Sequence, residues 1–163
     1  MTPKEPLSGL EELKLDYQEL SKKHKLPDFT ELNKQFDIED VQLDTEFLLR
    51  KIRRIITEKI TNYIRFVELL LNPSSAPMFF FNIIKKLETT DKTALSKIYE
   101  KLSSLEVQTI SLDLDYNEEK EVLFINKAFE LCSKEIKDSL LEIMKKISNG
   151  NNITKRNNGS YLG

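Results

Sequence analysis

The chain has 163 residues and a formal net charge of −2, and 39% of its residues are hydrophobic while 32% are charged. This length predicts one domain that can bury a sizeable core, and the near balance of charge does not favour a nucleic-acid or membrane partner. One cysteine and one histidine exclude an internal disulfide framework and a Cys/His zinc site, and four glycines with five prolines are too few turn residues for a β-sandwich or barrel.

The N-terminal region predicts a flexible arm followed by two short helices. Residues 1–7 contain two prolines and no apolar periodicity, which indicates the arm. Ser8 and Glu11 have capping-box spacing, so a helix is expected to start at Ser8 and to end before Pro27. Asp28 then predicts the cap of the second helix. The apolar strip of that helix is Phe29, Leu32 and Phe36.

A long amphipathic helix is expected from Asp44 to Asn72. Before it, residues 37–43 have an irregular apolar pattern, which indicates an extended connector. Asp44 or Thr45 is expected to cap the helix, and Asn72-Pro73 to end it. Apolar residues recur along it at spacings of three and four, with others beside them, so we expect further helices to cover it on several sides. The main stripe comprises Leu49, Ile52, Ile56, Ile60, Tyr63, Val67 and Leu70.

The middle of the chain predicts a loop and two more helices. The loop is the proline-containing segment 72–77, and a short, strongly apolar helix follows at 78–87. The next helix starts at residues 90–91. Its end is ambiguous, because Val107–Tyr116 contains a period-two fragment and yet also continues the helical pattern. We expect this helix to extend to about Leu112.

The C-terminal part predicts one long helix and a tail. Asn117 has the position of an N-cap, and the helix is expected to span residues 117–147. Asn149-Gly150 indicates its stop, and the polar residues 149–163 indicate a disordered tail.

Together these elements predict an all-α protein with a single helical domain at residues 8–148. We expect a bundle of about five to six helices, in which the long helices 44–72 and 117–147 pack along each other. No internal repeat and no compositional break divides the domain.

Two parts of the chain resemble a known family. The segments LPDFTELNKQFDI, FLLRKIRRIITEKI and LNP, between Leu26 and Pro73, together resemble a family of small archaeal helical proteins with no assigned activity. The segment EEKEVLFINKAFELCSKEIKDSLLEIMKKI is similar to the C-terminal helix of that family. The resemblance implies an all-helical, archaeal-type intracellular protein, and it implies no catalytic residue.

The candidate charged binding residues are Arg50, Arg53 and Arg54. Arg50 and Arg54 are one turn apart and face away from the main apolar stripe. Guanidinium groups can bind phosphates or carboxylates through two hydrogen bonds at once, so the patch could hold a partner. The alternative is a solvated helix face with local ion pairs, for example between Arg54 and Glu58.

The candidate apolar binding residues are Phe79 and Phe80, in the run Met78 to Phe81. Three successive phenylalanines cannot all point in one direction, so one of them could remain exposed and support docking or self-association. The alternative is that the run fills the core as a short helix.

Motifs for catalysis or cofactor binding are weak. Acidic residues cluster at 37–46 and 113–119 and could bind a hard cation, but the first cluster lacks EF-hand spacing. One histidine cannot supply the paired Glu-x-x-His motifs of a di-metal bundle. His24 is expected to be an exposed polar residue, and Cys132 a buried, inert thiol. We therefore expect no metal, no cofactor and no enzymatic activity.

These patterns favour a non-catalytic helical module for protein interaction or assembly, with an unknown protein or a second copy of the chain as partner. The alternative is a nucleic-acid- or ribosome-associated factor that binds through Arg50, Arg53 and Arg54. No stretch approaches the roughly 18 apolar residues of a membrane span, and the first residues do not form a signal peptide, so the cytoplasm is expected.

Overall fold

Helices make up all of the regular structure in residues 8–41 and 47–157, the part of the chain that the computed structural model describes. The side chains of residues 75, 79 and 150–157 lie outside this description. No strand occurs among the described residues, so the predicted all-α class is confirmed. The elements are α1 (Gly9–His24), α2 (Phe29–Phe36), η1 (Ile38–Asp40), α3 (Leu48–Leu71), η2 (Pro73–Ser75), α4 (Met78–Ile84), α5 (Thr89–Leu114), α6 (Glu118–Leu131), η3 (Cys132–Ile136) and α7 (Lys137–Asn157).

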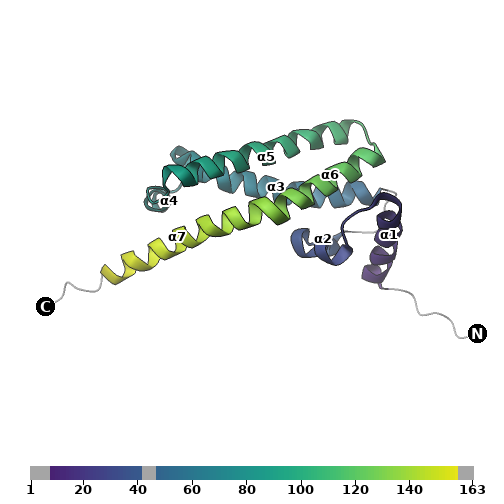
Figure 1. Cartoon of the computed structure of the whole chain (residues 1–163), viewed down its shortest axis with the longest axis horizontal. Coiled ribbons are helices and arrows are strands. Elements are labelled where there is room, and N and C mark those ends of the chain that lie inside the picture. Colours follow the sequence, from purple (N-terminus) through teal and green to yellow (C-terminus); the bar gives the residue numbers. More distant parts are fainter. Residues whose placement is uncertain (1–7, 42–46, 158–163) are drawn as a thin grey trace, which may run out of the picture.

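Long helices running side by side form the body of the bundle (Figure 1). The helix α3 packs along both α5 and α6, and α6 continues through η3 into α7 as one rod. The short helices α1 and α2 lie at the end of the body where α3 begins, and α4 lies at the other end against α7. The predicted packing of the long helix along the C-terminal helix is thereby confirmed, and α5 is its most extensive neighbour.

Branched aliphatic residues at helical spacing bury one stripe of α3. Ile52, Ile56 and Ile60 have no exposed surface. Ile64 takes the next buried position instead of the predicted Tyr63, which is half-buried. Burial of such a side chain contributes about 1.5–3 kcal/mol, so this stripe organises the core.

The long helix is shorter at its start than its pattern predicts. It begins at Leu48, and Phe47 before it has the N-cap position without a capping hydrogen bond from its side chain. The predicted helical conformation of Phe47 is therefore wrong, and its ring packs on Tyr116 instead, with 4.7 Å between the ring centroids. The predicted caps at 44–45 lie outside the described residues. The predicted end is confirmed, since α3 stops at Leu71, directly before Asn72-Pro73.

The predicted caps of the first two helices are confirmed. The Ser8 backbone N–H donates to Glu11 at 3.0 Å, and the Ser8 Oγ accepts from the Glu11 backbone at 3.4 Å. Asp28 accepts from the backbone of Thr30 at 2.8 Å. These contacts satisfy N–H groups that have no partner inside the first turn of a helix.

The connector after α2 is not extended, which corrects the prediction for its first residues. Ile38–Asp40 forms one 3₁₀ turn, and Ile38 is fully buried. The Asn33 side chain fixes this turn, because its Oδ1 accepts from the Glu39 backbone at 2.9 Å and its Nδ2 donates to the Glu39 carboxylate at 3.0 Å. A buried anchor and a local side-chain bridge thus outweigh the irregular sequence pattern.

The C-terminal rod continues past its predicted stop. Its helical conformation runs to Asn157, so the predicted stop at Asn149-Gly150 is wrong, while the predicted disordered tail stays a prediction. A glycine in a helix costs only about 1 kcal/mol relative to alanine, which is insufficient by itself to end a rod. The segment η3 within the rod is a π-helical turn.

Candidate interaction surface

Arg53, in the predicted basic patch, lies inside the bundle with 1% of its surface exposed. Its Nε donates to Glu121 of α6 at 2.8 Å, and its Nη2 donates to Asp113 of α5 at 2.6 Å. One guanidinium of α3 therefore joins three helices through charge-assisted hydrogen bonds.

The two carboxylates around Arg53 are in different environments. The hydrogen bond from Arg53 lowers the pKa of Asp113 below its ordinary value. Burial raises the pKa of Glu121, although the charge of Arg53 opposes this shift. Glu121 is fully buried, and its second oxygen has no hydrogen-bond partner among the described residues. The ionised form of Glu121 thus depends on Arg53.

The other two arginines of the predicted patch have separate surroundings. Arg54 is exposed, and its Nη2 lies 3.6 Å from Asp113, so its ion pair is with α5 and not with the predicted Glu58. The half-buried guanidinium of Arg50 lies over the ring of Tyr116, 4.8 Å from its centroid. Because the three arginines differ in burial and face acids from other helices, they do not form one solvated surface. Ligand binding by this patch stays a prediction.

The run Met78–Phe81 was predicted either to fill the core or to leave a phenylalanine exposed, and both environments occur in it. Phe80 is half-buried against the core, while Phe81 and Met78 are exposed. The side chain of Phe79 lies outside the described residues. Docking through Phe79 and Phe80 therefore also stays a prediction.

The prediction that His24 is exposed is wrong, whereas the predicted burial of Cys132 is confirmed. His24 was predicted to be exposed, but only 14% of its side chain is exposed, because the ring packs near the start of α6 and bonds Glu118. Cys132 is buried as predicted, and burial raises the pKa of its thiol to about 12. A protonated thiol is a poor nucleophile.

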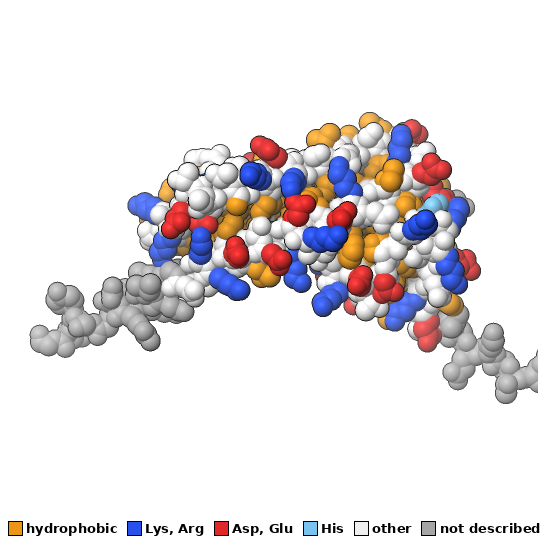
Figure 2. All heavy atoms as spheres, in the orientation of Figure 1, with side chains coloured by type: hydrophobic (Ala, Val, Ile, Leu, Met, Phe, Trp, Pro, Cys, Tyr) orange, Lys and Arg blue, Asp and Glu red, His pale blue; other side chains and the backbone are white. Residues whose placement is uncertain are grey.

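The outer face of α5 carries an aliphatic strip that the sequence interpretation did not single out. Val107, Ile110 and Leu114 follow one another at spacings of three and four, and they are 67%, 60% and 84% exposed. Leu123 on the neighbouring α6 is 67% exposed. We call these four residues the outer strip. Figure 2 shows hydrophobic side chains at the surface over this half of α5, at the upper right of the molecule.

The outer strip explains the ambiguous pattern of Val107–Tyr116. The segment is helical to Leu114, which confirms the helical interpretation. Leu105, Thr109 and Leu112 are buried on the inner face of the same helix. Apolar residues therefore occupy both faces, and that arrangement produces the apparent alternation. A helix with apolar residues on two sides usually has neighbours on both of them.

A groove runs between α5 and α6 beside the outer strip. One half has a volume of about 290 Å³, and we call it the apolar half because it contains Leu112, Leu123 and Phe124 and no acidic residue. The residues that line this half are Gln108, Ser111, Leu112, Lys120, Leu123, Phe124 and Lys127.

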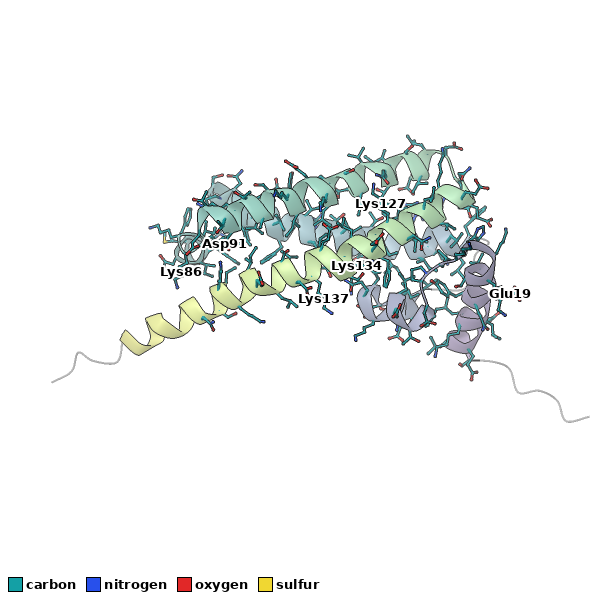
Figure 3. All side chains as sticks on the ribbon, viewed as in Figure 1. Glu19, Lys86, Asp91, Lys127, Lys134 and Lys137 are labelled. Carbon is teal, nitrogen blue, oxygen red and sulfur yellow. The ribbon has the colours of Figure 1, made fainter. Side chains whose placement is uncertain are left out.

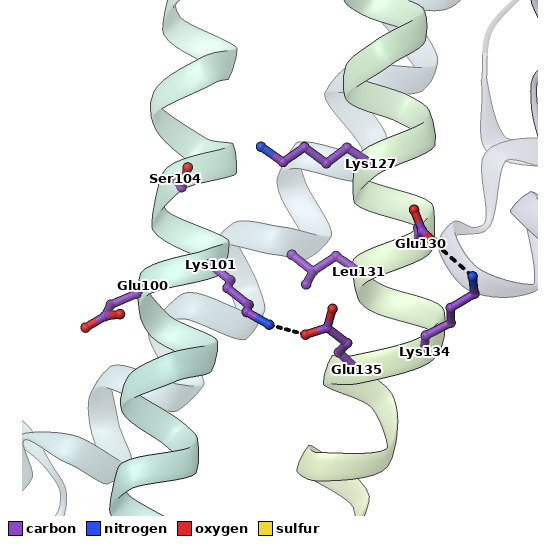
Figure 4. Close-up of a pocket in the computed structure, with 8 residues that line it drawn as sticks. All are labelled: Glu100, Lys101, Ser104, Lys127, Glu130, Leu131, Lys134 and Glu135. Carbon is purple, nitrogen blue, oxygen red and sulfur yellow. Dashed lines mark hydrogen bonds and ion pairs between the residues drawn. The ribbon is translucent and has the colours of Figure 1, made fainter.

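The charged half of the groove continues from Lys127 along the same two helices. Its volume is about 500 Å³, and ion pairs join Lys101 to Glu135 and Lys134 to Glu130 along it (Figure 4). Lys127 extends from α6 toward Ser104 of α5, so this side chain lies where the two halves meet. Figure 3 places Lys127 and Lys134 along the rod that forms one wall.

A second, mostly apolar hollow of about 380 Å³ lies between α3 and the rod. It has partly exposed Leu141 and Met144 at its mouth. Tyr63 and Phe66 of α3 form its opposite wall, and both are half-buried. Its aliphatic side chains are less exposed than those of the outer strip.

The described residues contain no group of three or more His, Cys, Asp or Glu side chains that could hold a metal ion. Among the helices that the structure describes, none combines the length and the apolar composition needed to cross a membrane. Comparison of the chain with models of protein families, with curated proteins and with solved structures finds no match. The resemblance to small archaeal helical proteins thus remains a prediction from the sequence.

Proposed function

We propose that this protein is a non-catalytic interaction module that binds an α-helix of another protein along the groove between α5 and α6. The observation that carries the proposal is the outer strip, whose four aliphatic side chains are each at least 60% exposed. Single exposed aliphatic residues are normal on a protein surface, whereas three at helical spacing on one face of α5, with a fourth on the neighbouring α6, are typical of a contact surface.

The spacing of the strip favours a helix as the bound element. Side chains three and four residues apart form a ridge, and ridges of this kind pack into the grooves of a second helix. A partner helix over α5 and α6 would cover the strip in the way that α3 covers the inner face of α5. Full burial of four such side chains would contribute on the order of 6–12 kcal/mol before the entropic cost of association is subtracted.

The nucleic-acid alternative has weaker support. It requires Arg50, Arg53 and Arg54 to contact phosphates together. Arg53 already donates to two carboxylates inside the bundle, and its release would leave Glu121 buried without its partner. Phosphate binding by this residue would therefore disrupt the packing of three helices.

Site-specific photo-crosslinking in an extract of the native cell tests the proposal. A photoreactive residue at position 107 or 123 should crosslink to the same partner, through a segment of that partner that is helical. Leu15 on α1 is 50% exposed and serves as a matched control, since the same residue placed there should not capture this partner. The replacements Val107→Ser, Ile110→Ser and Leu114→Ser, introduced together, should abolish the crosslink from position 123.

Two outcomes would contradict the proposal. An unchanged crosslink in the triple serine variant would show that the outer strip is not the contact. Crosslinks between copies of this chain, together with a doubled mass in light scattering as the concentration rises, would identify a homodimer in place of a foreign helix.

A further inference from the structure

Two lysines along one edge give the groove a positive charge. Lys120 and Lys127 of α6 both line its apolar half. Neither forms an ion pair with a residue that the structure describes. No aspartate or glutamate is among the residues lining this half. An occupant of this half would therefore meet two lysines and no acidic side chain in its lining.

The acids of α5 that flank Gln108–Leu112 are engaged with α3. Glu106 is the only acidic residue between Lys101 and Asp113. Its carboxylate accepts a hydrogen bond from Thr61 of α3 at 2.8 Å, and that of Asp113 accepts from Arg53 at 2.6 Å. These carboxylates are thus held away from the lysine edge.

The charged half of the groove differs, because its charges balance. Lys101 and Lys134 are each paired with a glutamate, and Glu100 and Lys127 are the remaining charged residues in its lining. The apolar half thus carries an excess of positive charge, of which Lys120 belongs to this half alone while Lys127 also lines the charged half.

The spacing of the lysines defines where acids on a partner would lie. Lys120 and Lys127 are seven residues apart, which is about 10.5 Å along a helix. On a helix lying alongside α6, residues separated by seven positions share one edge and match this distance. Aliphatic residues between them would face Leu123, the member of the outer strip that lines this half.

We infer that the occupant of the groove is an acidic amphipathic helix, with aliphatic residues at spacings of three and four and with carboxylates seven residues apart that pair with Lys120 and Lys127. This inference rests on the proposed function and deepens it. The strip supplies the area of contact, while the lysines select the charge and the register of the bound helix.

Binding of synthetic helical peptides to the full chain tests the inference by fluorescence anisotropy. One peptide carries leucines at spacings of three and four and two glutamates seven residues apart on the edge of that stripe. The second peptide has lysines in place of these glutamates, and the third has the glutamates on the opposite face. We expect the first peptide to bind roughly tenfold more tightly than the second, with less preference at high salt.

Charge reversal in the protein provides the matching variant. Lys120→Glu together with Lys127→Glu should invert the preference, so that the peptide with two lysines binds more tightly. Lys22→Glu together with Lys145→Glu changes the net charge equally at exposed lysines of α1 and α7, and it should leave the preference unchanged.

Several results would overturn the inference. Equal affinity for all three peptides, with loss of binding in the triple serine variant, would reject the acidic register and keep the proposed docking of a helix. Absence of binding to every peptide would reject both. Binding of the strip and the two lysines to anionic lipid vesicles, in place of the peptides, would identify a membrane surface as the occupant.

Discussion

In most proteins charged side chains lie at the surface and apolar side chains lie inside. The C-terminal half of α5 departs from this rule on both of its sides. Toward α3 and α6, Arg53 and Glu121 are buried charges. On the outer face, Val107, Ile110 and Leu114 are exposed aliphatic residues. The buried charges are paired with each other, whereas the outer aliphatic residues are not covered by any residue that the structure describes. Of these two sides, the outer face is the one on which a second molecule could bury apolar surface.

The largest expected effect is at Arg53. Its replacement by methionine keeps an apolar stem but leaves Glu121 buried without a partner, which should cost about 3–5 kcal/mol of unfolding free energy. Urea unfolding measures this loss. The double variant with Arg53→Met and Glu121→Met should recover much of it, because an apolar pair of similar volume often replaces a buried ion pair without loss. A double variant as unstable as the single one would show that the pair is not the cause.

A comparison of two leucines tests the inner and outer faces of α5 directly. Leu112→Ala should cost about 2–4 kcal/mol, because it leaves a cavity against the core. Leu114→Ala should change stability by less than about 0.5 kcal/mol, because its side chain is 84% exposed. Thermal unfolding of both variants gives the measurement. Similar losses at the two positions would show that the outer strip is covered in the free protein.

A third prediction concerns an ion pair at the opposite end of the bundle, where Asp91 lies near α4 (Figure 3). Lys146 of α7 donates to Asp91 at 2.6 Å, but half of the Lys146 side chain is exposed. Asp91→Asn should therefore cost only about 1 kcal/mol at neutral pH, less than the change at Arg53. Lys146→Met should give a similar loss, with little further loss when the two changes are combined.

The cost of Asp91→Asn should depend on pH. The bonds from Lys146 and from the Glu88 backbone lower the pKa of Asp91 below its ordinary 3.8. A lowered pKa gives a stabilisation that is present above the ordinary value and disappears as the pH falls through the folded one. The difference between the wild type and the variant should thus be constant well above the ordinary value of 3.8 and decrease as the pH falls below it. A difference that persists in acid would assign the effect to packing.

Among the charged residues, the smallest expected effect is at Asp113. Nearly half of this side chain is exposed, so solvent weakens its pair with Arg53. Asp113→Asn should cost less than about 1 kcal/mol in urea unfolding at neutral pH. A cost as large as that of Arg53→Met would mean that Asp113, and not Glu121, is the main partner of the buried guanidinium.

Local patterns along the chain predicted most of the fold. The cap at Ser8, the end of α3 before Pro73 and the helix through Val107 all follow from residues close in sequence, so periodicity and capping rules were sufficient. The continuation of the last helix beyond Gly150 was missed, because a single glycine destabilises a helix only slightly.

The candidate sites were harder to predict, because they depend on tertiary contacts. Arg53 meets acids that are 60 and 68 residues away in sequence, and no local pattern indicates such a pairing. The outer strip was not predicted, because the run Val107–Tyr116 was ambiguous in sequence. Its exposed face is defined by the tertiary contacts of α5, which bury Leu105 and Leu112 on the other side.

The π-helical turn at Cys132–Ile136 sets the rotational phase of the C-terminal rod. An α-helix advances about 100° for each residue, so the additional residue of a π turn rotates everything after it by about that angle. Without it, Ile143 and Ile147 would be turned by roughly a quarter of a circle from their present buried positions. Because of this one inserted residue, a single continuous rod packs against different helices along its length. Its first part, α6, contacts α3 and α5, and its last part, α7, contacts α4.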